Sequence, residues 1–139
     1  MLVTPHFSLA EFAQPAKRGL ERAEYPTEWI KERLMPLCEA MEVARAIVGK
    51  GFYILSGYRS PEYNKKLPGA ARKSQHMEGR AADIQVIGYS PEKLHDLFLE
   101  LHNMRRIRLG GLGLYPTFVH VDVRPGQRLA RWTGTRQTS

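Results

Sequence analysis

Apolar residues recur at helical spacing in two long stretches of the chain. The first stretch has one apolar face and ends at two glycines: Leu37, Met41, Ala44, Val48, Gly49 and Gly51. The second begins with a capping serine and a proline and also has one apolar face: Ser90, Pro91, Leu94, Leu97, Phe98, Leu101 and Met104. We predict a helix in each stretch. A proline inside a helix removes a hydrogen bond and clashes with the preceding turn, so we expect a break or kink at Pro36 in the helical region that Thr27 opens.

Capping residues indicate two shorter helices. Ser8 and Glu11 have the spacing of a capping box, and Phe7 and Phe12 are placed to close over it as a hydrophobic staple. A serine followed by a proline marks the start of another short helix at residues 60–63. Each predicted helix therefore begins at a recognisable cap.

Three segments are typical of strands, namely residues 52–56, 81–86 and 118–123. The last of them follows a glycine-rich stretch at 110–113 and is expected to be one of a final strand pair. The order of helices and strands predicts an α+β fold, with a small, mostly antiparallel sheet and helices packed on one side. The whole chain, residues 1–139, is expected to form a single domain.

Composition limits the chemistry that the chain can use. Hydrophobic residues make up 42% and charged residues 25%, as in ordinary globular proteins. The single cysteine excludes a disulfide framework and a cysteine-rich zinc site, so any metal site must use His, Asp or Glu. No stretch is long and apolar enough to span a membrane, and the N-terminus does not have the pattern of a signal peptide. We therefore expect synthesis in the cytoplasm without an export signal.

The formal net charge is +7, which favours polyanionic partners such as nucleic acid, anionic lipid or the acidic polymers of a cell wall. The basic residues are spread along the chain and form no nucleic-acid recognition motif. We therefore expect no specific nucleic-acid partner, and a solvated basic surface accounts for most of the charge.

Residues 74–83 form the first segment with candidate chemistry. His76 lies in a loop and Asp83 lies in the following predicted strand, and Gly79 permits a turn between them. On that strand Asp83 shares a face with Ala81, which is small and leaves space beside the carboxylate. A carboxylate on an apolar strand is costly to bury unless it is paired or binds a cation.

Residues 118–122 form the second such segment. Valines alternate there with His120 and Asp122, so that if the valines face the core, the two polar side chains share the opposite face. If the two strands are neighbours, His76, Asp83 and His120 can converge. Two histidines and one carboxylate, with a fourth position for water, form a known catalytic zinc set. Single strand histidines and aspartates are more often structural, so the residues alone leave both interpretations open.

Three motifs resemble those of the zinc D-Ala-D-Ala carboxypeptidase-like peptidases, which have the hedgehog/D,D-peptidase fold. They are Ser56-Gly57-Tyr58-Arg59-Ser60, then Ser74-x-His76-x-x-Gly79-x-Ala81-x-Asp83, then Gly111-x-Gly113-x-Tyr115 with Phe118-Val119-His120-Val121-Asp122. The resemblance extends over most of the chain, from Phe7 to Trp132. It implies that His76, Asp83 and His120 bind Zn²⁺ as the cofactor.

The resemblance also implies roles for two residues near the metal. Arg59 would contact a carbonyl or carboxylate of the substrate, which suits a guanidinium because it can stabilise an oxyanion or hold a carboxylate with two hydrogen bonds. Ser74 would either bind substrate or form a hydrogen bond that supports one of the metal ligands.

The sequence departs from the family pattern at the general base. Several branches have a Glu or Asp three residues before the late histidine, where this chain has Thr117. Asp122, on the same strand face as His120, is the best substitute, and Glu78 is a second candidate.

These features predict a zinc metallopeptidase that hydrolyses peptide bonds in peptidoglycan stem peptides, as a D,D-carboxypeptidase or an endopeptidase. The departure at Thr117 motivates the alternative of a non-catalytic module that binds cell-wall peptides on the same fold. The small size resembles phage-lysin-type enzymes, which act on the wall once released. We expect a monomer.

Overall fold

The computed structural model describes residues 1–17, 19–136 and 138–139. Its helices are the 3-10 helices η1 (Leu9–Phe12), η2 (Thr27–Trp29) and η4 (Gln75–Glu78), the π-helix η3 (Ile30–Leu34), and the α-helices α1 (Met35–Val48), α2 (Pro61–Lys66) and α3 (Pro91–Asn103). Its strands are β1 (Leu2–Thr4), β2 (Phe7–Ser8), β3 (Tyr53–Ser56), β4 (Ala81–Gln85), β5 (Gly111–Leu114), β6 (Val119–Asp122) and β7 (Ala130–Thr133). Among the described residues, no helix has the length and apolar character needed to cross a membrane.

A sheet with the strand order β3-β4-β6-β5-β7 forms the centre of the molecule. Its pairings are antiparallel except for that of β5 with β7, which is parallel. The strands β1 and β2 form a separate two-stranded ribbon. The predicted α+β class and mostly antiparallel sheet are therefore confirmed, while β7 and the β1–β2 ribbon were not predicted.

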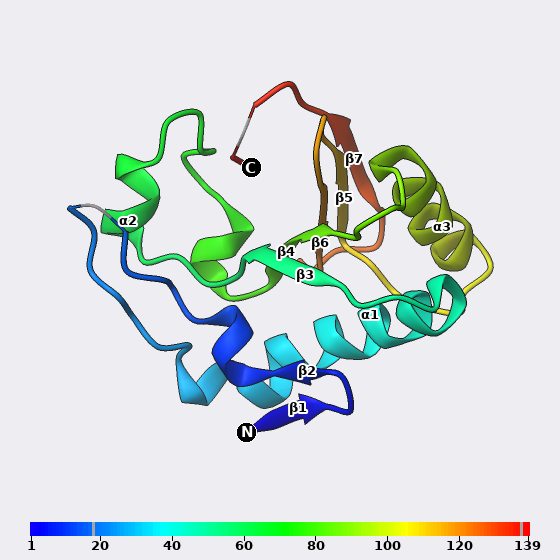
Figure 1. The fold of residues 1–139 in the computed structure, drawn as a ribbon, viewed down its shortest axis with the longest axis horizontal. Helices are drawn as coiled ribbons and strands as arrows, with labels where there is room; N and C mark the ends of the chain where they lie inside the picture. The colour runs from blue at the N-terminus through cyan, green and yellow to red at the C-terminus, as the bar shows by residue number, and fades with distance from the viewer. Residues whose placement is uncertain (18, 137) are drawn as a thin grey trace.

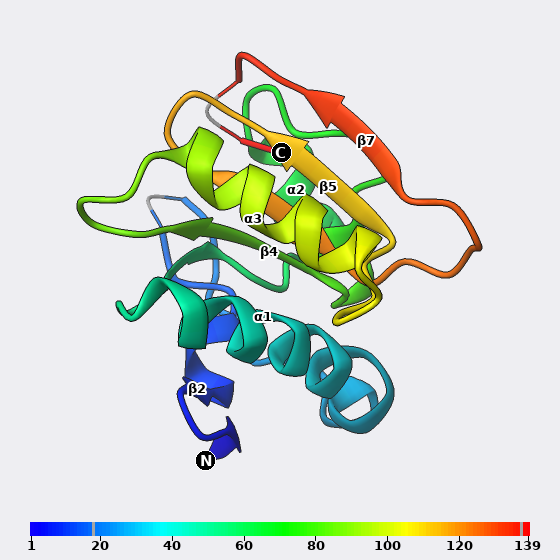
Figure 2. The same ribbon diagram turned by 90° about the vertical axis from the view of Figure 1, so that its right-hand side faces the viewer.

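Helices α1 and α3 lie on one side of the sheet, and α2 lies on the other side together with the C-terminal residues (Figures 1 and 2). Helix α3 contacts β5 and β6, and α1 contacts α3. The core between these layers contains every second residue of the central strands and the apolar face of α3: Ala82, Ile84, Val119, Val121, Leu112, Leu94, Phe98 and Leu101. The alternate residues of β4 and β6 consequently face away from α1 and α3.

The predicted helix starts are confirmed, with differences in helix type. The first helix is a single 3-10 turn in which the Ser8 amide donates to Glu11 Oε1 over 2.8 Å, and the rings of Phe7 and Phe12 lie 6.4 Å apart. The helix is not broken at Pro36: the π-helix η3 passes directly into α1, and Pro36 lies in the first turn of α1.

Candidate metal centre

The register between β4 and β6 places the key polar residues directly beside each other. Asp83 is paired with His120, and Ala81 is paired with Asp122. Since side chains alternate along each strand, all four project from the face that α1 and α3 do not cover. The expectation that these two strands are neighbours is confirmed.

A short loop helix brings His76 to this face of the sheet. Ser74 caps η4, and its Oγ accepts a hydrogen bond of 3.2 Å from the His76 amide. Gly79 ends the helix in the left-handed conformation, with φ of 67°, and a side chain there would collide with Tyr25 and Trp29. The hydroxyl of Tyr25 donates to the Gly79 carbonyl over 2.6 Å, so this turn is anchored from outside the loop.

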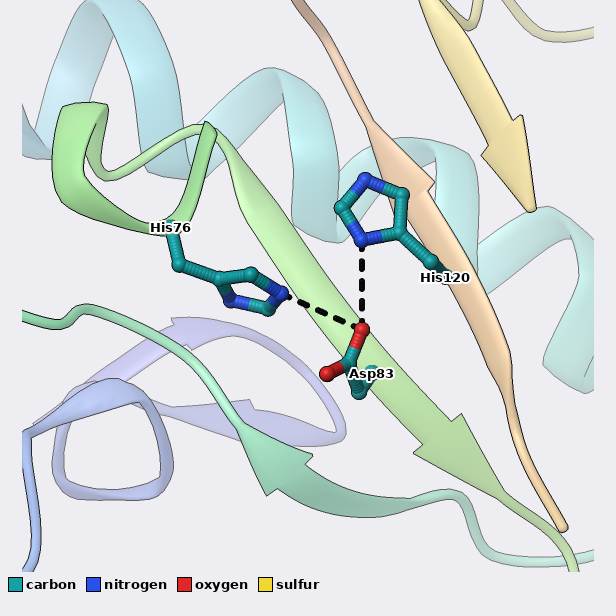
Figure 3. A group of neighbouring side chains, drawn as sticks. All are labelled: His76, Asp83 and His120. Atoms are coloured by element: carbon teal, nitrogen blue, oxygen red, sulfur yellow. Dashed lines mark hydrogen bonds and ion pairs between the residues drawn. The ribbon is translucent and has the colours of Figure 1, made fainter. Parts of the chain in front are cut away.

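His76, Asp83 and His120 converge on one point (Figure 3). Nε2 of His76 lies 3.1 Å from Asp83 Oδ1, and Nδ1 of His120 lies 3.2 Å from the same oxygen. Ligand atoms around a tetrahedral zinc ion, with bonds of 2.0–2.1 Å, lie about 3.3 Å from one another. The donor set and the two distances to Asp83 therefore fit a zinc ion, and all three ligand atoms lie within 4.8 Å of one another.

The ring nitrogens that face away from this point also have acceptors. Nδ1 of His76 donates to the Gly57 carbonyl over 2.8 Å, because a carbonyl can only accept. Nε2 of His120 lies 2.7 Å from Asp122 Oδ2. Each histidine is thus bonded on one nitrogen and directs the other toward Asp83.

Burial and neighbouring charges shift the pKa values of these groups in different directions. Burial raises the pKa of Asp83, but the imidazoles of His76 and His120 outweigh it and hold that pKa far below its usual range. Burial lowers the pKa of His76, which favours the neutral ring that a metal requires. Burial also lowers the pKa of His120, but hydrogen bonds with Asp122 and Asp83 outweigh it and the net shift is upward.

Arg59 lies beside the three residues and is only 1% exposed. Its Nε donates to Ser56 Oγ over 3.1 Å and its Nη1 donates to Asn64 Oδ1 over 3.0 Å. Its Nη2 lies 3.7 Å from Asp83 Oδ2 and donates to the backbone carbonyl of Ser139 over 2.8 Å. The guanidinium is thus held in one orientation and directs one donor group at an oxygen next to the centre.

Ser139 occupies the space between these groups. Its hydroxyl donates to the Asp83 carboxylate, with both oxygens at 2.7 Å. The same Oγ lies 2.8 Å from His76 Nε2 and 3.2 Å from His120 Nδ1. The hydroxyl oxygen of Ser139 therefore reaches all three candidate ligands, while the carbonyl of the same residue accepts a hydrogen bond from Arg59.

The other residues considered in the sequence occupy different places. Thr117 is exposed in the turn before β6, and its carbonyl accepts a hydrogen bond from Gln85. Glu78 is exposed and lies near Arg33 and Arg80. Asp122 contacts His120 on the side of the ring that faces away from Asp83. Its role as general base stays a prediction.

Two neighbours of His120 were missed in the sequence. Arg124 donates to the Asp122 carboxylate through Nε and Nη2, and the Trp132 ring lies 5.1 Å from the His120 ring. Strand alternation could have indicated Arg124, because it lies two residues after Asp122. Trp132 lies on β7, whose pairing with β5 has no local signal.

A cleft of about 270 Å³ opens beside Asp83 and Arg59. Its lining includes Asp83 and Arg59, the apolar side chains of Leu55 and Phe118, and Lys17.

The α+β fold thus brings together a buried His–Asp–His group that could hold a metal ion. The chain belongs to the Peptidase M15 family, the zinc D-Ala-D-Ala carboxypeptidase-like peptidases, because a model of that family matches residues 5–122. This membership implies a peptide substrate. A search of curated proteins finds no match to the chain.

Proposed function

We propose that this protein is a zinc-dependent peptidase that hydrolyses peptide bonds in peptidoglycan stem peptides. The observation that carries the proposal is the convergence of His76 Nε2, His120 Nδ1 and the Asp83 carboxylate in a buried position next to Arg59. Two imidazole nitrogens and a carboxylate that lie together in this way are the donor set of a catalytic zinc site.

His76, Asp83 and His120 would hold the zinc ion. When bound, zinc polarises a carbonyl and lowers the pKa of water to about 7. The chain has one cysteine, Cys38, which is buried in the core away from this face, so the ligands are nitrogen and oxygen atoms. That ligand set keeps a position free for substrate, as in catalytic zinc sites.

Arg59 would bind the carbonyl oxygen of the scissile bond or a terminal carboxylate of the substrate. Its Nη2 donates to the Ser139 carbonyl in the structure, so an oxygen can be bound there without moving the guanidinium. Because Arg59 is buried, its charge is weakly screened and acts strongly on an oxygen that becomes negative during the reaction.

Two further features support a cell-wall peptide as the substrate class. Lys17 lines the cleft with Arg59, and stem peptides carry free carboxylates that two cations can recognise. The net charge of +7 favours retention on an anionic wall. We further propose that the protein acts on the wall as a monomer once released, as phage-lysin-type enzymes do.

The proposal is tested by metal analysis and product analysis of the purified protein. We expect one zinc ion per chain, and we expect His76→Ala and His120→Ala to lower zinc affinity at least 100-fold and to abolish the release of new amines from peptidoglycan. Mass spectrometry of the products from a defined stem peptide identifies the bond, which separates carboxypeptidase from endopeptidase action.

His6→Ala is the matched control, because His6 is exposed and lies in the turn between β1 and β2. It should retain zinc and activity. A wild-type protein that binds no zinc contradicts the proposal. Zinc binding with peptide binding but no new amines would instead support the non-catalytic cell-wall-binding module.

A further inference from the structure

Asp122 lies behind His120 and is completely buried. Its Oδ2 is 2.7 Å from Nε2 of His120. Arg124 holds the same carboxylate: its Nε donates to Oδ1 over 2.9 Å, its Nη2 donates to Oδ2 over 2.7 Å, and its backbone amide donates to Oδ1 over 3.0 Å. The carboxylate therefore has a defined position relative to the imidazole.

These contacts determine which nitrogen of His120 carries hydrogen. A carboxylate that accepts from a guanidinium through both oxygens is an acceptor, so the hydrogen in its bond with His120 belongs to Nε2. Nδ1 then retains its lone pair when the ring is neutral, and Nδ1 is the nitrogen that lies 3.2 Å from Asp83. Figure 3 shows the second ring nitrogen of His120 directed away from Asp83.

The neighbouring strand is built to leave room for this arrangement. Gly111 is paired with Asp122, and a Cβ atom at Gly111 would collide with both carboxylate oxygens. A Cβ atom at Gly113 would collide with Trp132, whose ring packs against His120. The Cζ atom of Arg124 lies 5.1 Å from the centre of the Trp132 ring. The glycines of β5 thus make space for the groups that support His120.

We propose that Asp122, anchored by Arg124, is a positioning residue that keeps the hydrogen of His120 on Nε2 and directs Nδ1 toward the metal. This inference rests on the proposed zinc site and assigns Asp122 a different role from that of the general base. Acceptors of this kind behind metal-binding histidines commonly account for 10–100-fold in metal affinity.

The first test uses the wild-type protein with ¹⁵N-labelled histidine. NMR spectra of the zinc-loaded protein should show His120 bound to metal through Nδ1 with hydrogen on Nε2, and His76 bound through Nε2. Assignment uses the loss of one set of signals in His120→Ala. Binding of zinc through Nε2 of His120 would overturn the inference.

The second test measures zinc affinity by competition with a chelating indicator. Asp122→Asn and Asp122→Ala should weaken zinc binding about 10–100-fold. The absorption spectrum of the cobalt-substituted variants should also change. The matched control is Asp96→Asn, because Asp96 contacts a histidine outside the site, with 3.0 Å between its Oδ1 and His95 Nδ1.

The possible outcomes separate this inference from the proposed function. If the wild type binds no zinc, the proposed function itself fails. If the wild type binds zinc and a folded Asp122 variant binds it equally well while losing turnover, Asp122 acts on the substrate and the positioning role is wrong. Should Asp122→Ala not fold, the near-isosteric Asp122→Asn and the wild-type spectra still decide the question.

Discussion

Two glycines of β5, Gly111 and Gly113, leave the space that the groups supporting His120 occupy. Gly111 lies opposite Asp122, so the absence of a side chain leaves the volume that the carboxylate occupies. Asp122 in turn contacts His120, and His120 contacts Asp83. The position of His120, a candidate metal ligand, therefore depends on the space that Gly111 leaves by having no side chain.

We expect Gly111→Ala to reduce both stability and metal binding. The added methyl group must displace a buried carboxylate that is fixed by Arg124, and overpacking of this kind costs about 1–3 kcal/mol in the free energy of unfolding. Urea denaturation and zinc titration measure the two effects. Gly51→Ala is the control, because a side chain there meets no neighbouring atom and should change stability by less than about 1 kcal/mol. Equal behaviour of the two variants would contradict this account.

At the scale of elements, a hydrogen-bonded pair of side chains joins the N-terminal ribbon to α1. The turn between β1 and β2 carries His6, whose backbone amide donates to Glu42 Oε2 over 2.8 Å and whose Nδ1 lies 2.7 Å from Oε1. Partial burial raises the pKa of Glu42, but the hydrogen bonds with His6 outweigh it, so its pKa is lowered. The ribbon is thus held against the helix that covers the core.

A lowered pKa in the folded state gives this pair a defined pH dependence. Its contribution is fully present above the unfolded pKa of Glu42 and is lost as the pH falls through the folded pKa. We expect Glu42→Gln to destabilise the protein by about 0.2–1 kcal/mol at pH 7 and by less at pH 3.5. Urea unfolding at both pH values measures this. Glu39→Gln, at an exposed position on the same helix, should show no such difference.

At the scale of the whole molecule, the metal centre connects segments that are distant in the sequence. Its candidate ligands come from η4, β4 and β6, and its neighbours Arg59 and Ser139 lie 80 residues apart. In the unfolded chain these groups are separated, so a metal that binds them together binds the folded state.

Zinc should therefore stabilise the fold. At a free zinc concentration 100 times the dissociation constant, the gain is about 2.7 kcal/mol, which for a chain of this length raises the Tm by about 10 °C. Thermal unfolding with zinc and with excess chelator measures the difference. His76→Ala should show no zinc-dependent shift, and a wild-type Tm that chelation leaves unchanged would refute the prediction.

The periodicity of the sequence determined which face of each strand carries the candidate metal ligands. Alternation along residues 81–86 and 118–123 places Asp83 and His120 on the face opposite the apolar core, because successive side chains of a strand point to opposite sides. The capping residues Ser60 and Ser90 predicted where helices begin, because their side chains satisfy amides that only a helix start leaves free.

Only the tertiary structure decided what surrounds those residues. The pairing of β7 with β5, the contact of Asp122 with the rear nitrogen of His120, and the place of Ser139 all depend on register and on chain segments that meet late in the sequence. Local patterns encode which face a side chain occupies, since that follows from backbone geometry. They do not encode which partner it meets there, because that depends on packing between distant parts of the chain.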